Sequence, residues 1–153
     1  MDDLLDSIFS ELLDELLPED AEILRDLLHK IKEKIREHQG DEISPEVVAA
    51  IREAIRKLIR AILIARDKAR LQRELDDIQA EIAAIRKKNE SELSEAEKER
   101  LKELERSKAE TERRLEKTTR DAKAAQEDAL DAIDRIPLPN SGIRGPGRRG
   151  GGP

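Results

Sequence analysis

The residues best suited to chemistry in this sequence are an aspartate and a histidine three positions apart, Asp26 and His29. A carboxylate and an imidazole at this spacing share one face of a helix, as in the metal-binding pairs of some helical bundles. Such sites need a second pair of this kind and further inward-pointing glutamates, and the sequence offers neither. We therefore predict no metal site, and we expect both histidines, His29 and His38, to be partly exposed.

No arrangement of residues typical of an enzyme is present. The chain has no Cys, no glycine-rich phosphate loop before a helix and no Gly-x-Ser-x-Gly turn around a nucleophile. Its single aromatic residue, Phe9, cannot build a platform on which bases or sugars stack. We predict a non-enzymatic protein with no catalytic residue, no cofactor and no small-molecule substrate.

Two basic segments could bind an anionic partner. The C-terminal segment resembles a short RGG-type sequence, which binds nucleic acid or acidic protein through diffuse charge; its arginines are Arg144, Arg148 and Arg149. A flexible terminus that binds nothing is the alternative. The second segment, residues 52–73, holds eight bases against two acids. Because residues 1–20 hold eight acids and no base, we expect them to neutralise part of this charge within the chain.

The composition indicates long helices. Charged residues make up 43% of the chain and hydrophobic residues, alanine included, only 37%, so a thick globular core is not expected. The longest apolar run, residues 61–65, is far shorter than the ~20 residues that cross a membrane. The acidic start also lacks the basic region of a secretory signal. We predict an all-α, soluble, cytoplasmic protein with no membrane partner.

The elements are organised around one predicted helix, residues 44–89, in which Ser44 is a suitable N-cap and Pro45 a suitable first residue. Its two halves carry apolar stripes that point in different directions, which implies two different neighbours. The first stripe consists of Val48, Ile51, Ile55, Leu58, Ile59, Ile62 and Leu63, and the second of Leu71, Leu75, Ile78, Ile82 and Ile85.

Two predicted helices precede it. Residues 2–17 carry apolar doublets that cover roughly 200° of a helix surface, more than one neighbour can bury. We assign part of this surface to a protein partner or a second copy; the alternative is that neighbours in the same chain cover all of it. Residues 19–38 should run antiparallel to the central helix because the connection is short. The residues assigned to the protein partner or second copy are Leu5, Phe9, Leu13 and Leu17. The expected antiparallel pairs between residues 19–38 and the central helix are Ile35–Val48, Leu28–Ile55 and Leu24–Ile59.

One further helix, up to about residue 134, follows a capping-box pattern at Ser94 and Glu97. Folded back on the central helix, it pairs apolar residues near the turn and small residues further away. The predicted pairs include Ile82–Leu104, Leu75–Thr111, Ala61–Ala125 and Ala54–Ala132. We therefore expect a three-helix base (residues 1–64 with 118–135), a projecting antiparallel coiled-coil hairpin (65–117) and a disordered tail (136–153), which holds six of the seven glycines.

Three stretches resemble the idealised helices of de novo designed helical bundles: LPEDAEILRDLLHKIKEKI, SPEVVAAIREAIRKLI and SEAEKERLKELE. They are similar in their cap-plus-proline starts, their strong helix formers and the lack of Cys. The resemblance covers about residues 18–105 and implies that no natural substrate need exist. The Arg/Gly/Pro tail departs from that style, and a small natural coiled-coil protein is the alternative.

These observations lead to one functional hypothesis and one rival. We expect a helical scaffold or protein-interaction module that self-associates through its leucine-rich first helix. The rival is a natural charged coiled-coil adaptor, such as a phage-type scaffolding or nucleic-acid-associated protein, that docks on an acidic surface through its basic tail.

Overall fold

The computed structural model describes residues 2–40 and 42–139, which form four α-helices and contain no strand. The predicted all-α fold class is confirmed for these residues. The helices are α1 (Asp2–Asp14), α2 (Pro18–Glu37), α3 (Pro45–Arg86) and α4 (Glu95–Asp134), and a 3-10 turn, η1 (Glu90–Glu92), lies between the last two.

Local capping interactions explain where the two long helices begin. The Ser44 side chain accepts a hydrogen bond from the Val47 backbone N–H, with 3.2 Å between the two atoms. At the start of α4, Ser94 Oγ accepts from the Glu97 N–H at 3.1 Å, and the Glu97 carboxylate accepts from the Ser94 N–H at 3.0 Å. Both caps satisfy N–H groups that have no partner within the helix. The predicted capping box is therefore confirmed.

The connection between α2 and α3 is closed by a glycine. Gly40 has a φ of +87°, a backbone conformation in which any Cβ would be strained. It allows the chain to leave α2 sharply, and α3 then runs back along α2. Gly40 thus has a geometric role in the reversal of the chain.

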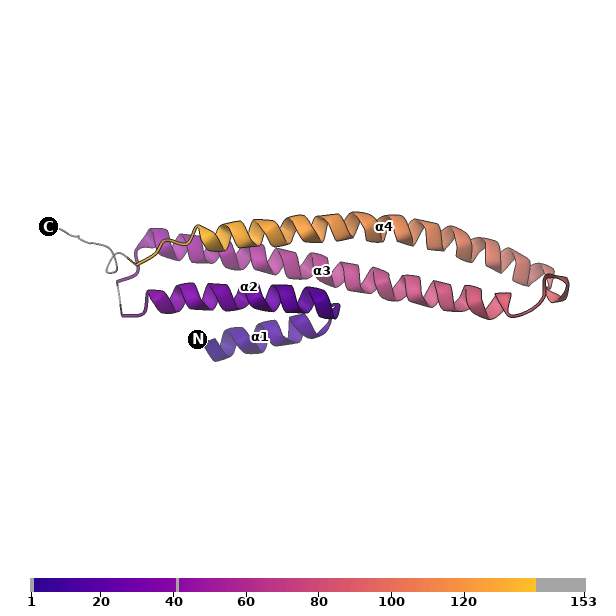
Figure 1. Cartoon of the computed structure of the whole chain (residues 1–153), viewed down its shortest axis with the longest axis horizontal. Coiled ribbons are helices and arrows are strands. Elements are labelled where there is room, and N and C mark those ends of the chain that lie inside the picture. Colours follow the sequence, from indigo (N-terminus) through magenta and orange to yellow (C-terminus); the bar gives the residue numbers. More distant parts are fainter. Residues whose placement is uncertain (1, 41, 140–153) are drawn as a thin grey trace.

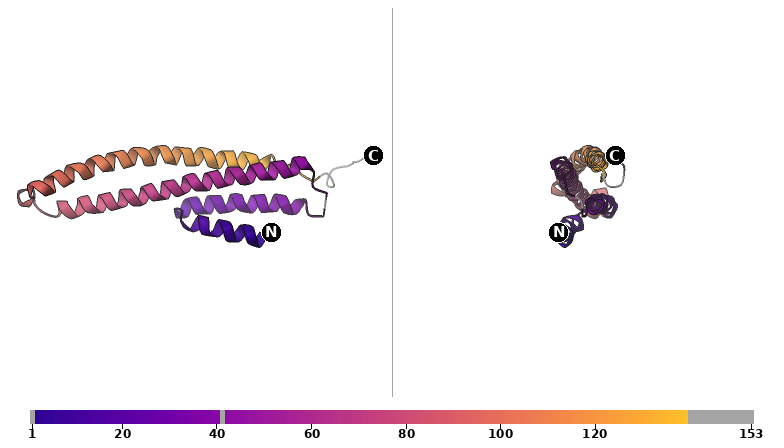
Figure 2. Two further views of the ribbon diagram at one scale, coloured as in Figure 1. Left: turned by 180° about the vertical axis from the view of Figure 1, so that it is seen from behind. Right: turned by 90° about the vertical axis from the view of Figure 1, so that its left-hand side faces the viewer.

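The two long helices form an extended pair, and the two short ones cover only part of it. α3 and α4 lie side by side and antiparallel over most of their length (Figure 1). α2 runs antiparallel along the first half of α3, and α1 folds back along α2. The end-on view in Figure 2 places α1 outside the other three helices, on the side away from α4. α1 and α3 therefore run in the same direction.

The main core lies where α2, α3 and α4 meet, and α1 contributes Phe9 and Leu13 to it. Its largest fully buried side chains come from α2, α3, α4 and the residues after α4: Leu24, Ile31, Leu58, Ile62, Ile133 and Ile136. Between α3 and α4 the core is lined by alanines, and Ala54, Ala61 and Ala129 have no exposed surface. Such small side chains let two helix backbones approach closely.

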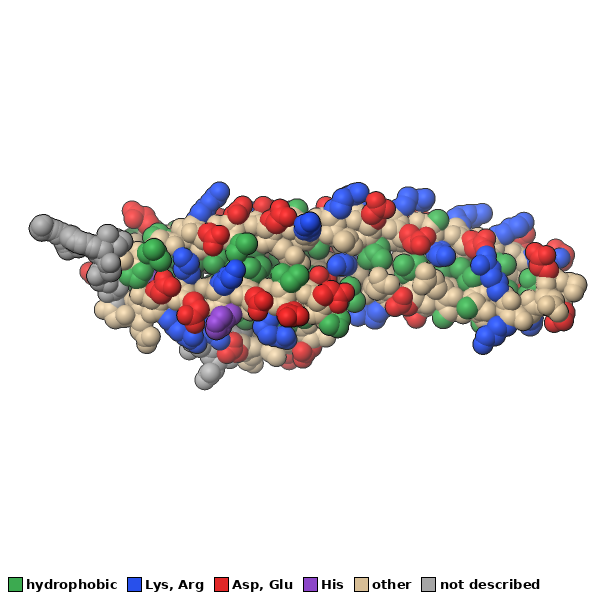
Figure 3. All heavy atoms as spheres, in the orientation of Figure 1, with side chains coloured by type: hydrophobic (Ala, Val, Ile, Leu, Met, Phe, Trp, Pro, Cys, Tyr) green, Lys and Arg blue, Asp and Glu red, His purple; other side chains and the backbone are tan. Residues whose placement is uncertain are grey.

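The part of the α3–α4 pair beyond α2 has a thinner core. Its buried side chains are Leu75, Ile82, Leu104 and Thr111. Charged side chains join the two helices near the turn: Lys88 Nζ lies 2.7 Å from Glu97 Oε2, Arg100 Nη2 lies 2.8 Å from Glu81 Oε2, and Arg86 pairs with Glu105. Figure 3 shows acids and bases intermixed along this face, with hydrophobic side chains visible between the helices.

One expectation about α3 is wrong. Val48 and Ile59, predicted to face α2, are 41% and 39% exposed. The buried residues of α3 lie on neighbouring lines of the helix and include Leu58, Ile62 and Ala65. The predicted stripe was wider than a single neighbouring helix covers, so its outer members lie on the surface.

A second expectation is wrong at the C-terminal side. Ile136, the first residue of the predicted disordered tail, is buried in the main core at 1% exposure. An apolar side chain directly after α4 can fill space between the helix ends, although two prolines follow it. The predicted tail beyond residue 139 lies outside the described residues. In the ranges that are described, no helix combines the length and hydropathy needed to cross a membrane.

Candidate interaction surface

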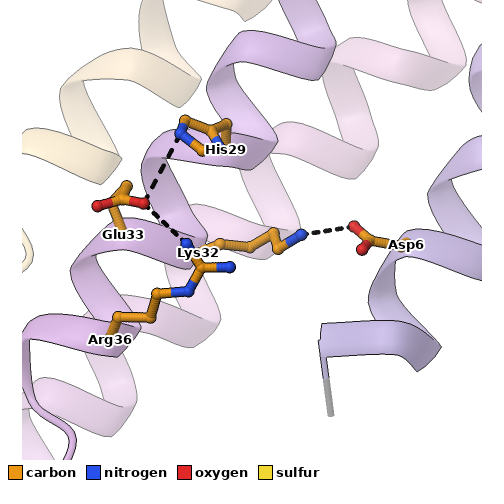
Figure 4. A network of polar contacts seen from close by, with 5 residues as sticks. All are labelled: Asp6, His29, Lys32, Glu33 and Arg36. Carbon is orange, nitrogen blue, oxygen red and sulfur yellow. Dashed lines mark hydrogen bonds and ion pairs between the residues drawn. The ribbon is translucent and has the colours of Figure 1, made fainter.

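Asp26 and His29, for which no metal role was predicted, lie on the water-facing side of α2. His29 Nε2 is 3.7 Å from Glu33 Oε1, and Arg36 Nη1 is 2.9 Å from the same oxygen (Figure 4). Asp26 is also exposed. Among the described residues there is no group of three or more His, Cys, Asp or Glu side chains that could hold a metal ion. These residues form a surface ion-pair network, which solvent screens strongly.

The neighbouring Lys32 has a different role from the rest of this network. Its Nζ lies 2.7 Å from Asp6 Oδ1, and Asp6 belongs to α1 (Figure 4). The Lys32 side chain is mostly buried between the two helices, whereas the Asp6 side chain is half exposed. This contact fixes α1 on one flank of α2.

The second histidine is not exposed as expected. His38 is 5% exposed, and its Nε2 lies 2.6 Å from the backbone oxygen of Pro137. Because a carbonyl oxygen only accepts hydrogen bonds, Nε2 must carry the proton. His38 thus ties the end of α2 to the segment after α4. Helical periodicity could not reveal this contact, since it joins two segments that lie outside the periodic pattern.

A buried ion pair holds the first turn of α2 against α3. Asp20 is 4% exposed, and its Oδ2 and Oδ1 lie 3.1 Å and 3.4 Å from Lys68 Nζ. The Lys68 side chain is also largely buried. A charge removed from water in this way is stable only with a partner at close range. Nothing in the periodic pattern distinguished this acid from the seven others in residues 1–20.

The residues predicted to bind a partner through α1 are mostly inside the protein. Phe9 and Leu13 are 2% and 3% exposed, and both belong to the main core. Leu17 is partly buried. Leu5 lies in α1, and its side chain is outside what the structure describes. Among the apolar residues of α1 whose side chains the structure describes, the exposed ones are Leu4 and Ile8, the other members of the same doublets.

Exposed apolar side chains of α1 and α3 form the candidate surface. Leu4 is 61% exposed, Ile8 and Leu63 are each 48% exposed, and Ile59 is 39% exposed. Leu12 and Ile55 are partly buried against the core. We call these six residues the α1–α3 strip.

One ion pair shows that the two halves of the strip adjoin each other. Glu15 directly follows α1, and its Oε2 lies 3.0 Å from Arg66 Nε, so the C-terminal end of α1 lies beside α3. When the 100° step of α1 is continued by one residue to Glu15, Leu4 and Ile8 lie within about 20° of it around the helix axis. On α3, Ile59 and Leu63 lie within about 60° of Arg66 by the same step. The exposed apolar residues of both helices therefore lie along one side of the molecule.

The two edges of the strip carry opposite charges. On α1 the exposed acids Glu11 and Asp14 have no ion pair within the described part of the chain. On α3 the same is true of the exposed base Arg60, which lies about 60° beyond Leu63 around the helix. At the Leu63 end of the strip lies a hollow of about 390 Å³ lined by Glu15, Leu63, Arg66, Asp67, Arg70 and Arg73. The surface is thus apolar in the middle, acidic on one side and basic on the other.

The predicted anion-binding residues divide into two sets. The arginines of α3 are exposed as a group, although Arg66 is paired with Glu15 and Arg70 Nη2 lies 3.0 Å from Asp67 Oδ1. The tail arginines, Arg144, Arg148 and Arg149, lie outside the described residues.

A second hollow lies between α3 and α4, near the end of α4. It measures about 470 Å³ and is lined by Ala50, Glu53, Lys57, Asp128, Asp131, Ala132 and Arg135. Both acids and bases line it, so its charge indicates no single class of ligand. The α1–α3 strip is the more specific surface.

Comparisons of the chain with protein-family models, with curated proteins and with solved structures find no match.

Proposed function

We propose that this protein is a helical interaction module, without catalytic activity, that associates with a second copy of itself through the α1–α3 strip. The observation that carries the proposal is the exposure of Leu4, Ile8, Ile59 and Leu63 on one surface. Single exposed apolar residues are ordinary on protein surfaces, but a contiguous apolar row with polar edges is typical of an interface.

The architecture around the strip supports a scaffold. We propose that residues 1–64 with 118–135 form a helical base and that residues 65–117 form a projecting coiled-coil hairpin. The α3–α4 ion pairs near the turn and the buried Leu75, Ile82 and Leu104 support this division. A designed bundle of this kind would need no natural substrate, in line with the resemblance of its helices to designed ones.

The strip can be tested without disturbing the core. The variant Ile8→Ser with Leu63→Ser removes two exposed side chains, whereas deletion of residues 1–17 would also remove the buried Phe9 and Leu13. We expect the unmodified chain to have at least the mass of a dimer by light scattering at micromolar concentration. The variant should be monomeric at the same concentration, because its interface loses much of its apolar area.

A matched control uses another exposed isoleucine. Ile23 is 44% exposed on α2. By the helical step it points away from Lys32, which marks the side of α2 that faces α1. Ile23→Ser should leave the mass unchanged. Circular dichroism must show equal helix content in all three proteins. A monomeric unmodified chain, or a variant that keeps the dimer mass, would reject the proposal.

The exposed arginines favour one second candidate, a charged adaptor for an anionic partner. Arg52, Arg60 and Arg73 form no ion pair with other described residues. Association through charge should weaken steeply with salt. The test compares binding of a labelled oligonucleotide and of an acidic peptide to three proteins, at low and high salt. These are the full chain, a chain ending at residue 139 and a triple Arg→Gln variant of α3. If neither change weakens binding, the adaptor function is excluded.

A further inference from the structure

We infer that the two copies are related by a two-fold axis parallel to the helices, so that α1 of each copy lies on α3 of the other. The inference rests on the proposed function, because it specifies how two α1–α3 strips meet. It follows from the heights of the strip residues along the helices and from the charges at the two edges.

The apolar residues of α1 and α3 lie at matching heights. Within one copy, the ion pair between Glu15 and Arg66 sets these residues level with each other. α1 and α3 run in the same direction (Figure 1), so counting back from this pair sets Leu12 level with Leu63 and Ile8 level with Ile59. A two-fold axis parallel to the helices preserves height. It therefore brings Ile8 of one copy to Ile59 of the other, and Leu12 to Leu63.

The charges favour the same arrangement. Glu11 lies about level with Arg60, and neither has an ion-pair partner in the described part of its own chain. When α1 of one copy lies over α3 of the other, this acid meets this base twice, once on each side of the axis. The acidic edge of each strip then faces a basic edge, as complementary interfaces require.

The other symmetric arrangement is disfavoured by like charges. A two-fold axis perpendicular to the helices would place α1 on α1 and α3 on α3. Glu11 and Asp14 would then face the same acids, and the arginines of α3 would face arginines. Charges of one sign at such distances repel, and the water excluded from the interface would no longer screen them.

The inferred arrangement has a consequence for the shape of the dimer. Both turns between α3 and α4 would project from the same end, because the axis preserves the direction of every helix. Both copies of residue 139, the last described residue, would lie towards the opposite end. The two arginine-rich segments that follow would begin there together, so a partner with two acidic sites could bind both at once.

A distance measurement between the two turns tests the direction of the axis. The chain has no native Cys, so Ser91→Cys, at an exposed position in the turn, accepts a single spin label. From a rise of about 1.5 Å per residue, an axis perpendicular to the helices through the strip puts the two labels about 95 Å apart. The inferred axis puts them below about 50 Å. Dipolar spectroscopy on the dimer distinguishes these values.

A charge exchange tests the contact itself. Glu11→Lys and Arg60→Glu should each weaken the dimer about fivefold at low salt, because each change creates two repulsive contacts. The double variant should return to within about twofold of the unmodified chain. If α1 instead lies on α1, residues 11 and 60 do not meet, so the effects of Glu11→Lys and Arg60→Glu should be independent and the double variant should not return to the affinity of the unmodified chain.

The outcomes separate the inference from the proposed function. A monomer at every concentration rejects both. A dimer that depends on Ile8 and Leu63 but holds its labels about 95 Å apart keeps the proposed function and overturns only the direction of the axis. A short label distance together with rescue by the double variant supports the inferred arrangement.

Discussion

At the scale of single residues, the buried ion pair of Asp20 and Lys68 should have the clearest effect on the free energy of unfolding. Lys68→Met removes the cation but keeps an apolar stem of similar length, so Asp20 stays buried without its partner. We expect the free energy of unfolding to fall by about 3 kcal/mol. This is the low end for a broken buried pair, because Asp20 also lies near the positive end of α2. Urea unfolding followed by circular dichroism at one protein concentration measures the change.

The matched variant removes both charges. Asp20→Asn combined with Lys68→Met leaves no unpaired buried ion, and most of the lost stability should return. If Lys68→Met alone unfolds at the same urea concentration as the unmodified chain, the pair does not hold the first turn of α2 in place.

The leucine doublets show what a single sequence cannot decide. Each doublet of α1 offers two apolar residues about 100° apart, and periodicity is satisfied by either one. The structure buries Phe9 and Leu13 and exposes Leu4 and Ile8. The choice depends on the direction from which α2 approaches, which contacts such as Lys32–Asp6 determine. The prediction that α1 has surplus apolar surface therefore needed no tertiary information, but the identity of the exposed residues did.

At the scale of the elements, the start of α4, beside the turn from α3, should become less stable at acidic pH. The pKa of Glu97 is lowered, chiefly by its hydrogen bond with Lys88 and then by the Ser94 backbone N–H of the capping box. The ionised carboxylate thus stabilises the start of α4. This contribution is present above the ordinary pKa of glutamate and is lost as the pH falls through the lowered value. We expect the protection of backbone amides at the start of α4 against hydrogen exchange to decrease over that acidic range.

Glu97→Gln is the matched control, because an amide keeps the shape of the cap but does not titrate there. In that variant, protection of the first turn of α4, corrected for intrinsic exchange, should not change across the same pH range. Equal pH dependence in both proteins would show that another group controls this end of the helix.

Helix boundaries were predictable because they depend on local chemistry. Ser44 with Pro45, Gly40, and Ser94 with Glu97 mark the ends of elements through contacts between residues close in sequence. The faces of the helices were harder. Val48 and Ile59 fit the apolar stripe of α3 as well as Leu58 does, and only the positions of α2 and α4 decide which of them is buried. Likewise, the contact of His38 with Pro137 joins segments 99 positions apart, where no repeat connects them.

At the scale of the whole molecule, stability should be uneven along the α3–α4 pair. In the base, α3 packs against α2 and α4 and buries residues without exposed surface, such as Leu58 and Ile62. Beyond Ala69 only α3 and α4 face each other, and ion pairs on exposed surfaces add little. Amides of residues 72–86 and 95–115 should therefore exchange faster with solvent than those of residues 54–65 and 122–133.

A single substitution can test whether the thin core causes this difference. Thr111 is 8% exposed in the distal part and forms no hydrogen bond through its side chain within the described residues. Thr111→Val replaces the hydroxyl with a methyl group of nearly the same shape and similar helix propensity. The added apolar burial should stabilise the distal part by about 0.5–1 kcal/mol. Exchange of its amides should slow by about two- to fivefold, while exchange in the base stays the same. Slowing of both parts by the same factor would mean that the hairpin and the base open as one unit, and that the uneven burial along α3 does not divide the molecule.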